Sequence, residues 1–161
     1  MSNTKTINEN SFFQFSLKSE IIKAVKEMGF KHPTPIQEKV IPHLISSDQD
    51  LIASAQTGTG KTAAFGLPVL STTKINDSSV QTLILCPTRE LCMQIANDLV
   101  GYSKYLKEIK ILAVYGGTKI DKQIKSLKKG PQIVIGTPGR TKDLIKRKKL
   151  FIGRIQRLIL D

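Results

Sequence analysis

Five short apolar runs recur along the chain, and the segments between them have helical spacing. The runs are DLIAS at 50–54, TLILC at 82–86, KILAVY at 110–115, QIVIG at 132–136 and RLILD at 157–161. Continuous hydrophobicity of this length is typical of strands buried on both faces of a sheet. The helical segments lie at 61–71, 89–101, 118–129 and 139–148. Strands that alternate with helices predict an open α/β fold with a parallel sheet, whose ligands bind beyond the carboxyl ends of the strands.

Two further helices are expected before the first of these runs. One helical face of residues 15–30 carries Leu17, Ile21, Val25 and Met28. Gly29 is a suitable residue to end that helix. The second helix is expected to begin at TPIQ, with Thr34 as its N-cap and Pro35 at its first position. Thr34 and Gln37 also have the spacing of a capping box, which is a sufficient structural reason for this tetrapeptide.

Composition limits the class of protein. The chain has 161 residues, 40% of them hydrophobic, which is enough for one domain with a sizeable core. Its N-terminus is polar and no apolar run approaches the roughly 20 residues of a membrane-spanning helix, so we expect a cytoplasmic protein. Cys86 and Cys92 have neither disulfide-framework nor metal-site spacing and are expected to be buried thiols.

The net charge of +12 is concentrated in the second half of the chain. Residues 1–80 contain eight lysines and seven acids, whereas residues 81–161 contain seventeen Lys or Arg and six acids. Such asymmetry indicates a polyanionic partner bound by the second half. A solvated basic surface explains the same charges, so charge alone leaves both interpretations open.

The sequence ASAQTGTGKT, at 53–62, follows the first apolar run and opens a helix. It fits the phosphate-loop pattern, with Ala55 at the first small position and Gly60, Lys61 and Thr62 at the end. Glycines let backbone N–H groups surround phosphate oxygens, and the positive end of the following helix adds to the attraction. The lysine reaches the β and γ phosphates, and the threonine hydroxyl is a ligand for Mg²⁺.

A phosphate loop needs a second acid, which holds Mg²⁺ through water at the end of a neighbouring strand. Asp161 follows the last apolar run and is the best candidate, while Asp50 precedes the phosphate-loop strand and would lie at its wrong end. The loop by itself does not define the nucleotide. A small-molecule kinase or a GTPase is one alternative, although no guanine-reading Asn-Lys-x-Asp motif occurs. A nucleic-acid-binding module that hydrolyses nothing is another.

Five separated motifs occur in the order of the DEAD-box RNA helicases. They are GFKHPTPIQ at 29–37, AQTGTGKT at 55–62, PTRELCMQI at 87–95, GG at 116–117 and TPGR at 137–140. The chain resembles this family from about residue 12 to residue 161. The resemblance implies a RecA-like P-loop NTPase domain (12–161) after a flexible segment (1–11), with an adenine-specificity segment at 12–37 and a core at 50–161.

The resemblance also implies roles for individual residues. Gln37 would bond the adenine edge, Thr34 would support the phosphate loop and Phe12 would stack on the base. An amide offers both a donor and an acceptor, which suits adenine and mismatches guanine. ATP and Mg²⁺ are the implied cofactors, with Thr62 and Asp161 as metal ligands and Lys61 in a catalytic role. The implied nucleotide-binding set is completed by the loop residues Ala55, Gln56, Thr57, Gly58, Thr59 and Gly60.

Single-stranded RNA is the implied partner of the second half. The positions that match RNA-contacting residues of the family are Thr88, Arg89, Gly116, Gly117, Thr137, Gly139 and Arg140. Glycines permit close approach and Arg140 offers a bidentate fork to phosphate, so contacts to the RNA backbone with little sequence specificity are expected. Thr88 is also a good helix N-cap, and both roles are compatible. Thr141 stands where the family more often has an apolar residue.

In the family, the strand that ends at Asp161 continues as Asp-Glu-Ala-Asp. The Glu that activates water, a Ser-Ala-Thr motif and a second RecA-like domain with arginine fingers would follow residue 161. The expectation is therefore a parent protein that is an RNA-dependent ATPase and RNA helicase. The 161 residues themselves are expected to bind ATP–Mg²⁺ and RNA but to hydrolyse almost nothing, because arginine fingers contribute orders of magnitude in rate.

Overall fold

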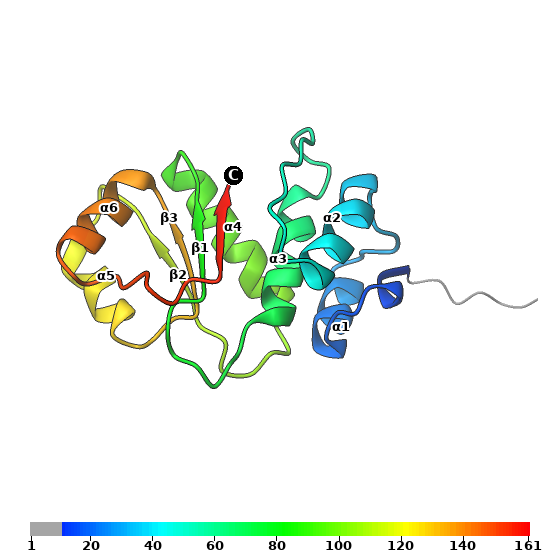
Figure 1. The fold of residues 1–161 in the computed structure, drawn as a ribbon, viewed down its shortest axis with the longest axis horizontal. Helices are drawn as coiled ribbons and strands as arrows, with labels where there is room; N and C mark the ends of the chain where they lie inside the picture. Colours follow the sequence, from blue (N-terminus) through cyan, green and yellow to red (C-terminus); the bar gives the residue numbers. More distant parts are fainter. Residues whose placement is uncertain (1–10) are drawn as a thin grey trace, which may run out of the picture.

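A four-stranded parallel sheet forms the centre of the molecule in a computed structural model that describes residues 11–161 (Figure 1). The strands are β1 (Thr82–Leu85), β2 (Ile111–Val114), β3 (Ile133–Gly136) and β4 (Arg157–Leu160). Their spatial order is β2-β3-β1-β4, and every neighbouring pair is parallel. The predicted α/β class and parallel sheet are confirmed.

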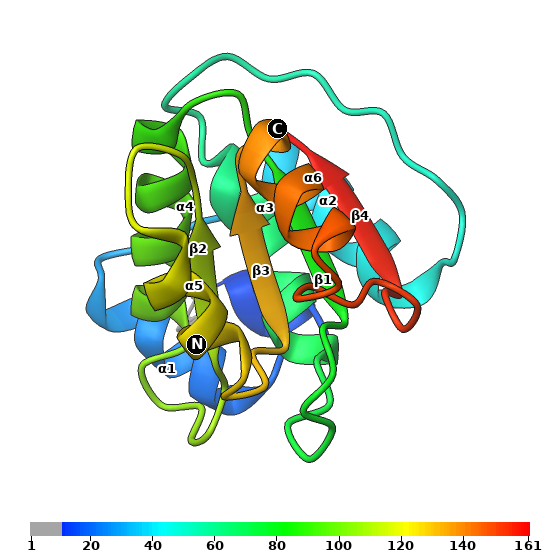
Figure 2. The ribbon, with the colours of Figure 1, turned by 90° about the vertical axis from the view of Figure 1, so that its left-hand side faces the viewer.

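Helices cover both faces of this sheet. In chain order the elements are η1 (Ser11–Gln14), α1 (Ser19–Glu27), α2 (Pro35–Ser46), α3 (Lys61–Thr72), α4 (Arg89–Tyr102), α5 (Ile120–Leu127) and α6 (Pro138–Lys146). α5 and α6 lie on one side of the sheet, and the other helices lie on the opposite side (Figures 1 and 2). α4 packs on β2 and β3, α3 packs on α4, and α2 packs on α3. The helices α1 to α4 therefore form a layered block on one side of the sheet.

The period of two along each strand divides the apolar side chains between two cores. In β3, Ile133 and Ile135 belong to the larger core, which lies under α1–α4, whereas Val134 belongs to the smaller core under α5 and α6. In β1, Ile84 faces the larger core and Leu83 the smaller one. Runs that look uniformly hydrophobic in the sequence are thus buried on both faces, as predicted for the central strands.

Most of the expected helices form, with small shifts at their ends. Thr34 is the N-cap of α2 and Pro35 is its first residue, as predicted. Leu17, Ile21 and Val25 are buried, but Met28 is 47% exposed, because α1 ends at Glu27 before its face returns to the core. The predicted flexible segment 1–11 lies outside the described residues except for Ser11, at the start of η1.

The first predicted strand is wrong. Residues 50–54 form no strand, and Figure 2 shows this segment within a long connection that arches outside the sheet. Ile52 is 101% exposed and Leu51 is 41% exposed. Within the described part of the chain, no backbone hydrogen bond joins this segment to the sheet. An apolar run becomes a strand only where a neighbouring strand satisfies its backbone groups, and here none does.

The last strand is half-buried on one face and exposed on the other, which also differs from the prediction. Leu158 is 58% exposed and Leu160 is 74% exposed, while Ile159 packs against the larger core. By register, Leu158 lies on the same face as Leu83, the face that α5 and α6 cover elsewhere. β4 is the edge strand of the sheet, so these two helices do not cover it.

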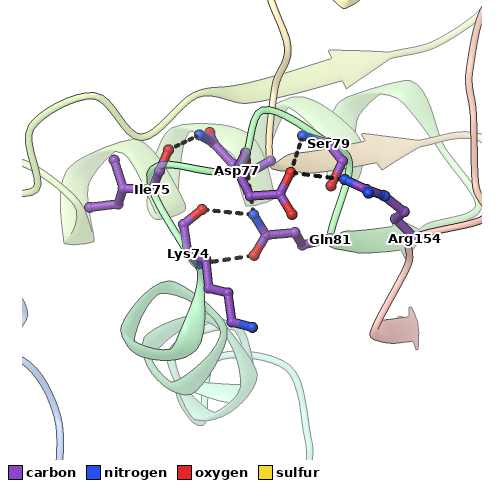
Figure 3. Close-up of polar contacts among 7 residues, drawn as sticks. Lys74, Ile75, Asp77, Ser79, Gln81 and Arg154 are labelled. Carbon is purple, nitrogen blue, oxygen red and sulfur yellow. Dashed lines mark hydrogen bonds and ion pairs between the residues drawn. The ribbon is translucent and has the colours of Figure 1, made fainter.

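Two buried glutamines close the amino-terminal edge of the sheet, and Figure 3 shows the contacts of one of them, Gln81. Gln81 accepts a hydrogen bond from the Lys74 N–H at 2.9 Å and donates to the carbonyls of Lys74 and Asp77 at 2.8 and 3.0 Å. Gln132 accepts from the Lys110 N–H at 2.8 Å and donates to the Ile75 carbonyl at 3.0 Å. These bonds fix the incoming loops at the edge opposite to the strands' carboxyl ends.

The two cysteines are buried thiols, as predicted. Cys92 lies in α4, with its thiol donating to the Ile135 carbonyl at 3.2 Å. Burial raises the pKa of Cys92 to about 12, so the thiol stays protonated at neutral pH. In the described residues, no helix combines the length and hydrophobicity needed to cross a bilayer.

Candidate functional site

The carboxyl ends of the four strands carry the residues predicted to bind RNA, together with Asp161. β1 leads into Thr88, β2 into the diglycine at 116–117, β3 into Thr137, and β4 into Asp161. Because the sheet order is β2-β3-β1-β4, the three segments predicted to bind RNA are adjacent, and Asp161 lies beyond them. Parallel strands end at one edge, so positions far apart in the sequence come together.

Asp161 and Lys61 form an ion pair at this edge. The Lys61 Nζ lies 2.6 Å from the Asp161 Oδ1. The Asp161 side chain is 5% exposed and that of Lys61 is 41% exposed. The backbone holds the acid in place, because the Asp161 N–H donates to the Leu85 carbonyl at 2.9 Å. The structure thus brings together the two charged groups that the sequence assigned to phosphate and Mg²⁺.

The phosphate loop has the backbone that its glycines predict. Gly58 and Gly60 have φ angles of 81° and 83°, in the left-handed region that favours glycine. The following helix, α3, begins at Lys61. Among the described residues, the N–H groups of 57–60 have no hydrogen-bond partner in the protein. These donors and the helix N-terminus form an arrangement suited to an anion.

The start of α2 holds the phosphate loop from outside. The Thr34 hydroxyl donates to the Thr59 carbonyl at 2.8 Å, and the Gln37 Nε2 donates to the Gly60 carbonyl at 3.1 Å. A Cβ at Gly60 would collide with the Gln37 amide, so this close approach requires glycine. Gln37 also accepts from the Thr34 N–H at 3.0 Å, as a capping box requires. Both ends of this amide, which is 2% exposed, are engaged within the protein.

The structure does not support Phe12 as a residue that stacks on a base. Its side chain is fully buried in the larger core. Its ring makes an edge contact with Phe15 at 5.9 Å between centroids and a tilted contact with Phe30 at 6.1 Å. A ring enclosed in this way presents no open face to a ligand.

The segments predicted to contact RNA are linked to one another. Thr88 is the N-cap of α4 and accepts from the Leu91 N–H at 3.2 Å. The Arg89 guanidinium lies over the Tyr115 ring at 5.0 Å from its centroid, next to Gly117. Gly117 has a φ of 78°. The loop after β2 therefore lies directly beside the start of α4.

The Arg140 guanidinium donates its hydrogen bonds to groups of the protein itself. Its Nη1 donates to the Gln123 Oε1 at 2.9 Å and its Nη2 donates to the Thr118 carbonyl at 3.0 Å. The bidentate fork that the sequence assigned to an RNA phosphate is thus directed to protein acceptors. Gln123 was not predicted. The available signal was its place between Ile120 and Ile124, where a polar residue interrupts an apolar stripe.

The donor set at the edge fits a nucleotide with Mg²⁺. The lysine, the free loop N–H groups and the α3 N-terminus match the phosphates, and the hydroxyl of Thr62 and the carboxylate of Asp161 are oxygen ligands of the type that Mg²⁺ prefers. One carboxylate suffices at such a site, because Mg²⁺ keeps several waters and takes phosphate oxygens as further ligands. The described residues contain no cluster of three or more acidic, histidine or cysteine ligands, as a metal cage would require.

Comparison with known proteins agrees with this arrangement. Residues 34–161 match the DEAD/DEAH box helicase family. The chain belongs to this family. The ATP-dependent RNA helicase CshA of Listeria monocytogenes is 52% identical over 150 residues, which cover 93% of this chain and 28% of the relative. The ATP-dependent RNA helicase DeaD of Escherichia coli is 42% identical, over 95% of this chain and 24% of the relative.

Solved DEAD-box structures share the fold. A DEAD-box protein from Methanococcus jannaschii superimposes with a TM-score of 0.88 at 41% identity, over 93% of this chain and 40% of that one. Saccharomyces cerevisiae Dbp5, in a structure with RNA and ADP BeF3, superimposes with a TM-score of 0.84 at 34% identity, over 93% and 37%. The chain thus spans about a quarter of the length of the curated DEAD-box relatives it matches.

Proposed function

We propose that this chain binds ATP–Mg²⁺ and single-stranded RNA at one edge of its sheet, as the first part of an RNA-dependent ATPase and RNA helicase. The observation that carries the proposal is the ion pair between Lys61 and Asp161, located beside the three loops at the ends of β1, β2 and β3. Nucleotide chemistry and an RNA path would then share one rigid edge, so that one ligand can influence the other.

In this proposal the phosphate loop supplies most of the nucleotide affinity. The N–H groups of residues 57–60 and the ammonium of Lys61 surround the phosphates, and Thr62 with Asp161 holds Mg²⁺. The metal would neutralise phosphate charge and orient the β and γ phosphates. The loop residues from Ala55 to Gly60 contribute backbone contacts, which depend on shape more than on side-chain identity.

Gln37 and Thr34 would connect the base to the phosphate loop. Their hydrogen bonds to Gly60 and Thr59 hold the loop from outside. For Gln37 to bond an adenine edge, its amide must exchange the Gly60 carbonyl for the base. Adenine binding would then break the hydrogen bond from Gln37 to Gly60 and so change the conformation of the phosphate loop.

The proposed RNA path runs over Thr88, Arg89, Gly116, Gly117, Thr137 and Gly139. These residues lie at the ends of three adjacent strands, and most of them are exposed. Backbone N–H groups, hydroxyls and a guanidinium recognise phosphate and sugar, so little sequence preference is expected. The basic second half of the chain adds a long-range attraction.

Because the chain spans about a quarter of its relatives, hydrolysis and duplex separation are proposed for the whole protein, together with a second RecA-like domain. For these 161 residues we propose binding with very slow turnover. We also propose a cytoplasmic location, because RNA and ATP are both available there.

Binding measurements on this chain test the proposal. Fluorescent ATP is titrated with Mg²⁺ into the wild type and Lys61→Ala, with unlabelled GTP as competitor, and labelled single-stranded RNA is titrated separately. We expect Lys61→Ala to lose ATP binding and to keep RNA binding, and we expect GTP to compete poorly. Unchanged ATP binding by Lys61→Ala would contradict a nucleotide site at the phosphate loop. An absence of RNA binding by the wild type would contradict the proposed RNA path.

A further inference from the structure

The loop after β2 and the segment after β3 are joined by a partly buried hydrogen-bond network. Its centre is Gln123 of α5, which is 8% exposed. Gln123 is the buried residue of α5, whereas the apolar residues of this helix are half-buried. A polar side chain at the most buried position of a short helix needs partners, because an unpaired amide in such a place costs about 1–3 kcal/mol.

Gln123 uses both ends of its amide. Its Nε2 donates to the Tyr115 carbonyl at 3.0 Å and to the Thr118 hydroxyl at 2.8 Å. Its Oε1 accepts from the Arg140 Nη1 at 2.9 Å. No other uncharged side chain of this size offers two donors and an acceptor at one tip. A carboxylate would keep the bond to Arg140 but would place an acceptor against the Tyr115 carbonyl.

The network encloses the diglycine. Tyr115 and Thr118 flank Gly116 and Gly117, and Arg140 closes the ring by donating to the Thr118 carbonyl at 3.0 Å. A Cβ placed on Gly116 would meet no atom within 4 Å, and one placed on Gly117 would meet only the Arg89 guanidinium, at 3.6 Å, so this side of the diglycine is open. Tyr115 is also held by packing against the larger core and by the Arg89 guanidinium over its ring, whereas the hydrogen bonds of Gln123 and Arg140 hold the loop on the other side of the diglycine, at Thr118.

We propose that Gln123 is a positioning residue for RNA binding. It fixes the diglycine loop and, through Arg140, the loop at 137–139, so that both present their backbone to one RNA strand at a set spacing. In this role Arg140 acts mainly through Thr118 and Gln123 and not as a phosphate ligand. The inference rests on the proposed RNA path and specifies what holds that path in shape.

Variants of Gln123 separate this role from general stability. Gln123→Met keeps the volume and removes every hydrogen bond, and Gln123→Glu keeps the bond to Arg140 alone. Gln156→Met is the matched control, because Gln156 is exposed and lies at the opposite edge of the sheet. For each protein we would measure the Kd for a labelled single-stranded RNA at several salt concentrations, the Kd for ADP, and the Tm.

We expect Gln123→Met to weaken RNA binding about tenfold, because part of the free energy of its three hydrogen bonds would no longer hold the loops in place. Gln123→Glu should lie between it and the wild type. The ADP Kd should not change, and the dependence of log Kd on log salt should keep its slope, since no phosphate contact is removed. Combining Gln123→Met with Arg140→Gln should cost little more than either change alone, because the two residues form one unit.

Three results would overturn the inference. RNA binding by Gln123→Met equal to that of Gln156→Met would show that the network does not position the RNA path. A parallel loss of RNA and ADP binding with a much lower Tm, shared by Gln123→Glu, would assign the residue to stability alone. A salt slope that falls by about 0.7 in Arg140→Gln alone, with additive effects, would make Arg140 a phosphate ligand. Failure of the proposed function is distinct, since the wild type would then bind no RNA.

Discussion

The ion pair between Lys61 and Asp161 has a consequence for nucleotide affinity that depends on Mg²⁺. Without metal, the lysine must leave the carboxylate at 2.6 Å before it can reach a phosphate, and the carboxylate then repels that phosphate. With metal, the same carboxylate is proposed to help hold Mg²⁺. Asp161→Asn should therefore tighten metal-free nucleotide binding and weaken binding in the presence of Mg²⁺.

The size of the effect follows from the burial of the pair. Exposed ion pairs contribute about 0.2–1 kcal/mol, whereas removing one partner of a fully buried pair costs about 3–5 kcal/mol. Here Asp161 is 5% exposed but Lys61 is 41% exposed and remains hydrated, so the cost of separating them lies nearer the lower range. We take about 1–2 kcal/mol, which corresponds to a gain of about 5- to 30-fold in metal-free affinity.

The assay is a titration of fluorescent ADP in EDTA and again with excess Mg²⁺. Asp50→Asn is the matched control, because Asp50 is exposed and its replacement changes the net charge equally. We expect Asp161→Asn to bind more tightly than the wild type in EDTA and more weakly with Mg²⁺, and Asp50→Asn to follow the wild type. Weaker binding of Asp161→Asn in both buffers, or equal tightening in Asp50→Asn, would refute the competition between carboxylate and phosphate.

Two further predictions concern stability. The Thr141 hydroxyl is buried without a hydrogen-bond partner, whereas that of Thr73, equally buried, donates to the Val69 carbonyl at 2.7 Å. Thr141→Val should therefore raise the free energy of unfolding by about 1 kcal/mol and Thr73→Val should lower it by about 1 kcal/mol in urea denaturation, and a loss in both would contradict the assignment. Burial raises the pKa of Asp98, so ionisation of this group opposes folding and stability falls as the pH rises from the unfolded-state pKa through the folded-state one. Asp98→Asn should raise the Tm at pH 7, and its advantage should vanish in acid, below the ordinary Asp pKa; a gain that persists there would point to another cause.

Local pattern was enough to predict much of this molecule. The apolar runs identified all four strands of the sheet, and in the central strands β1 and β3 burial on two faces leaves few polar positions. Thr34 and Pro35 marked the start of α2, since a helix terminus is stabilised by residues within one turn. The phosphate loop was recognisable for the same reason, as its glycines, lysine and helix N-terminus are contiguous.

Some predictions failed where the outcome depends on a neighbour. The run at 50–54 has the composition of a strand, yet it is exposed, because pairing is a property of two segments. Phe12 was assigned to stack on the base because of its spacing from Gly29. In the structure its ring packs against Phe15 and Phe30 and is buried in the larger core. Spacing along the chain does not show whether other side chains will cover the faces of an aromatic ring.

The sequence by itself determined which groups of this protein carry charge, where most of its helices lie, and where glycines turn the backbone ahead of α3. These depend on covalent geometry and on interactions within a few residues. Only the tertiary structure decided that Lys61 meets Asp161, and that Arg140 is held by Gln123 and Thr118. The partners of a polar side chain depend on which strand ends lie side by side, and the sheet order sets that.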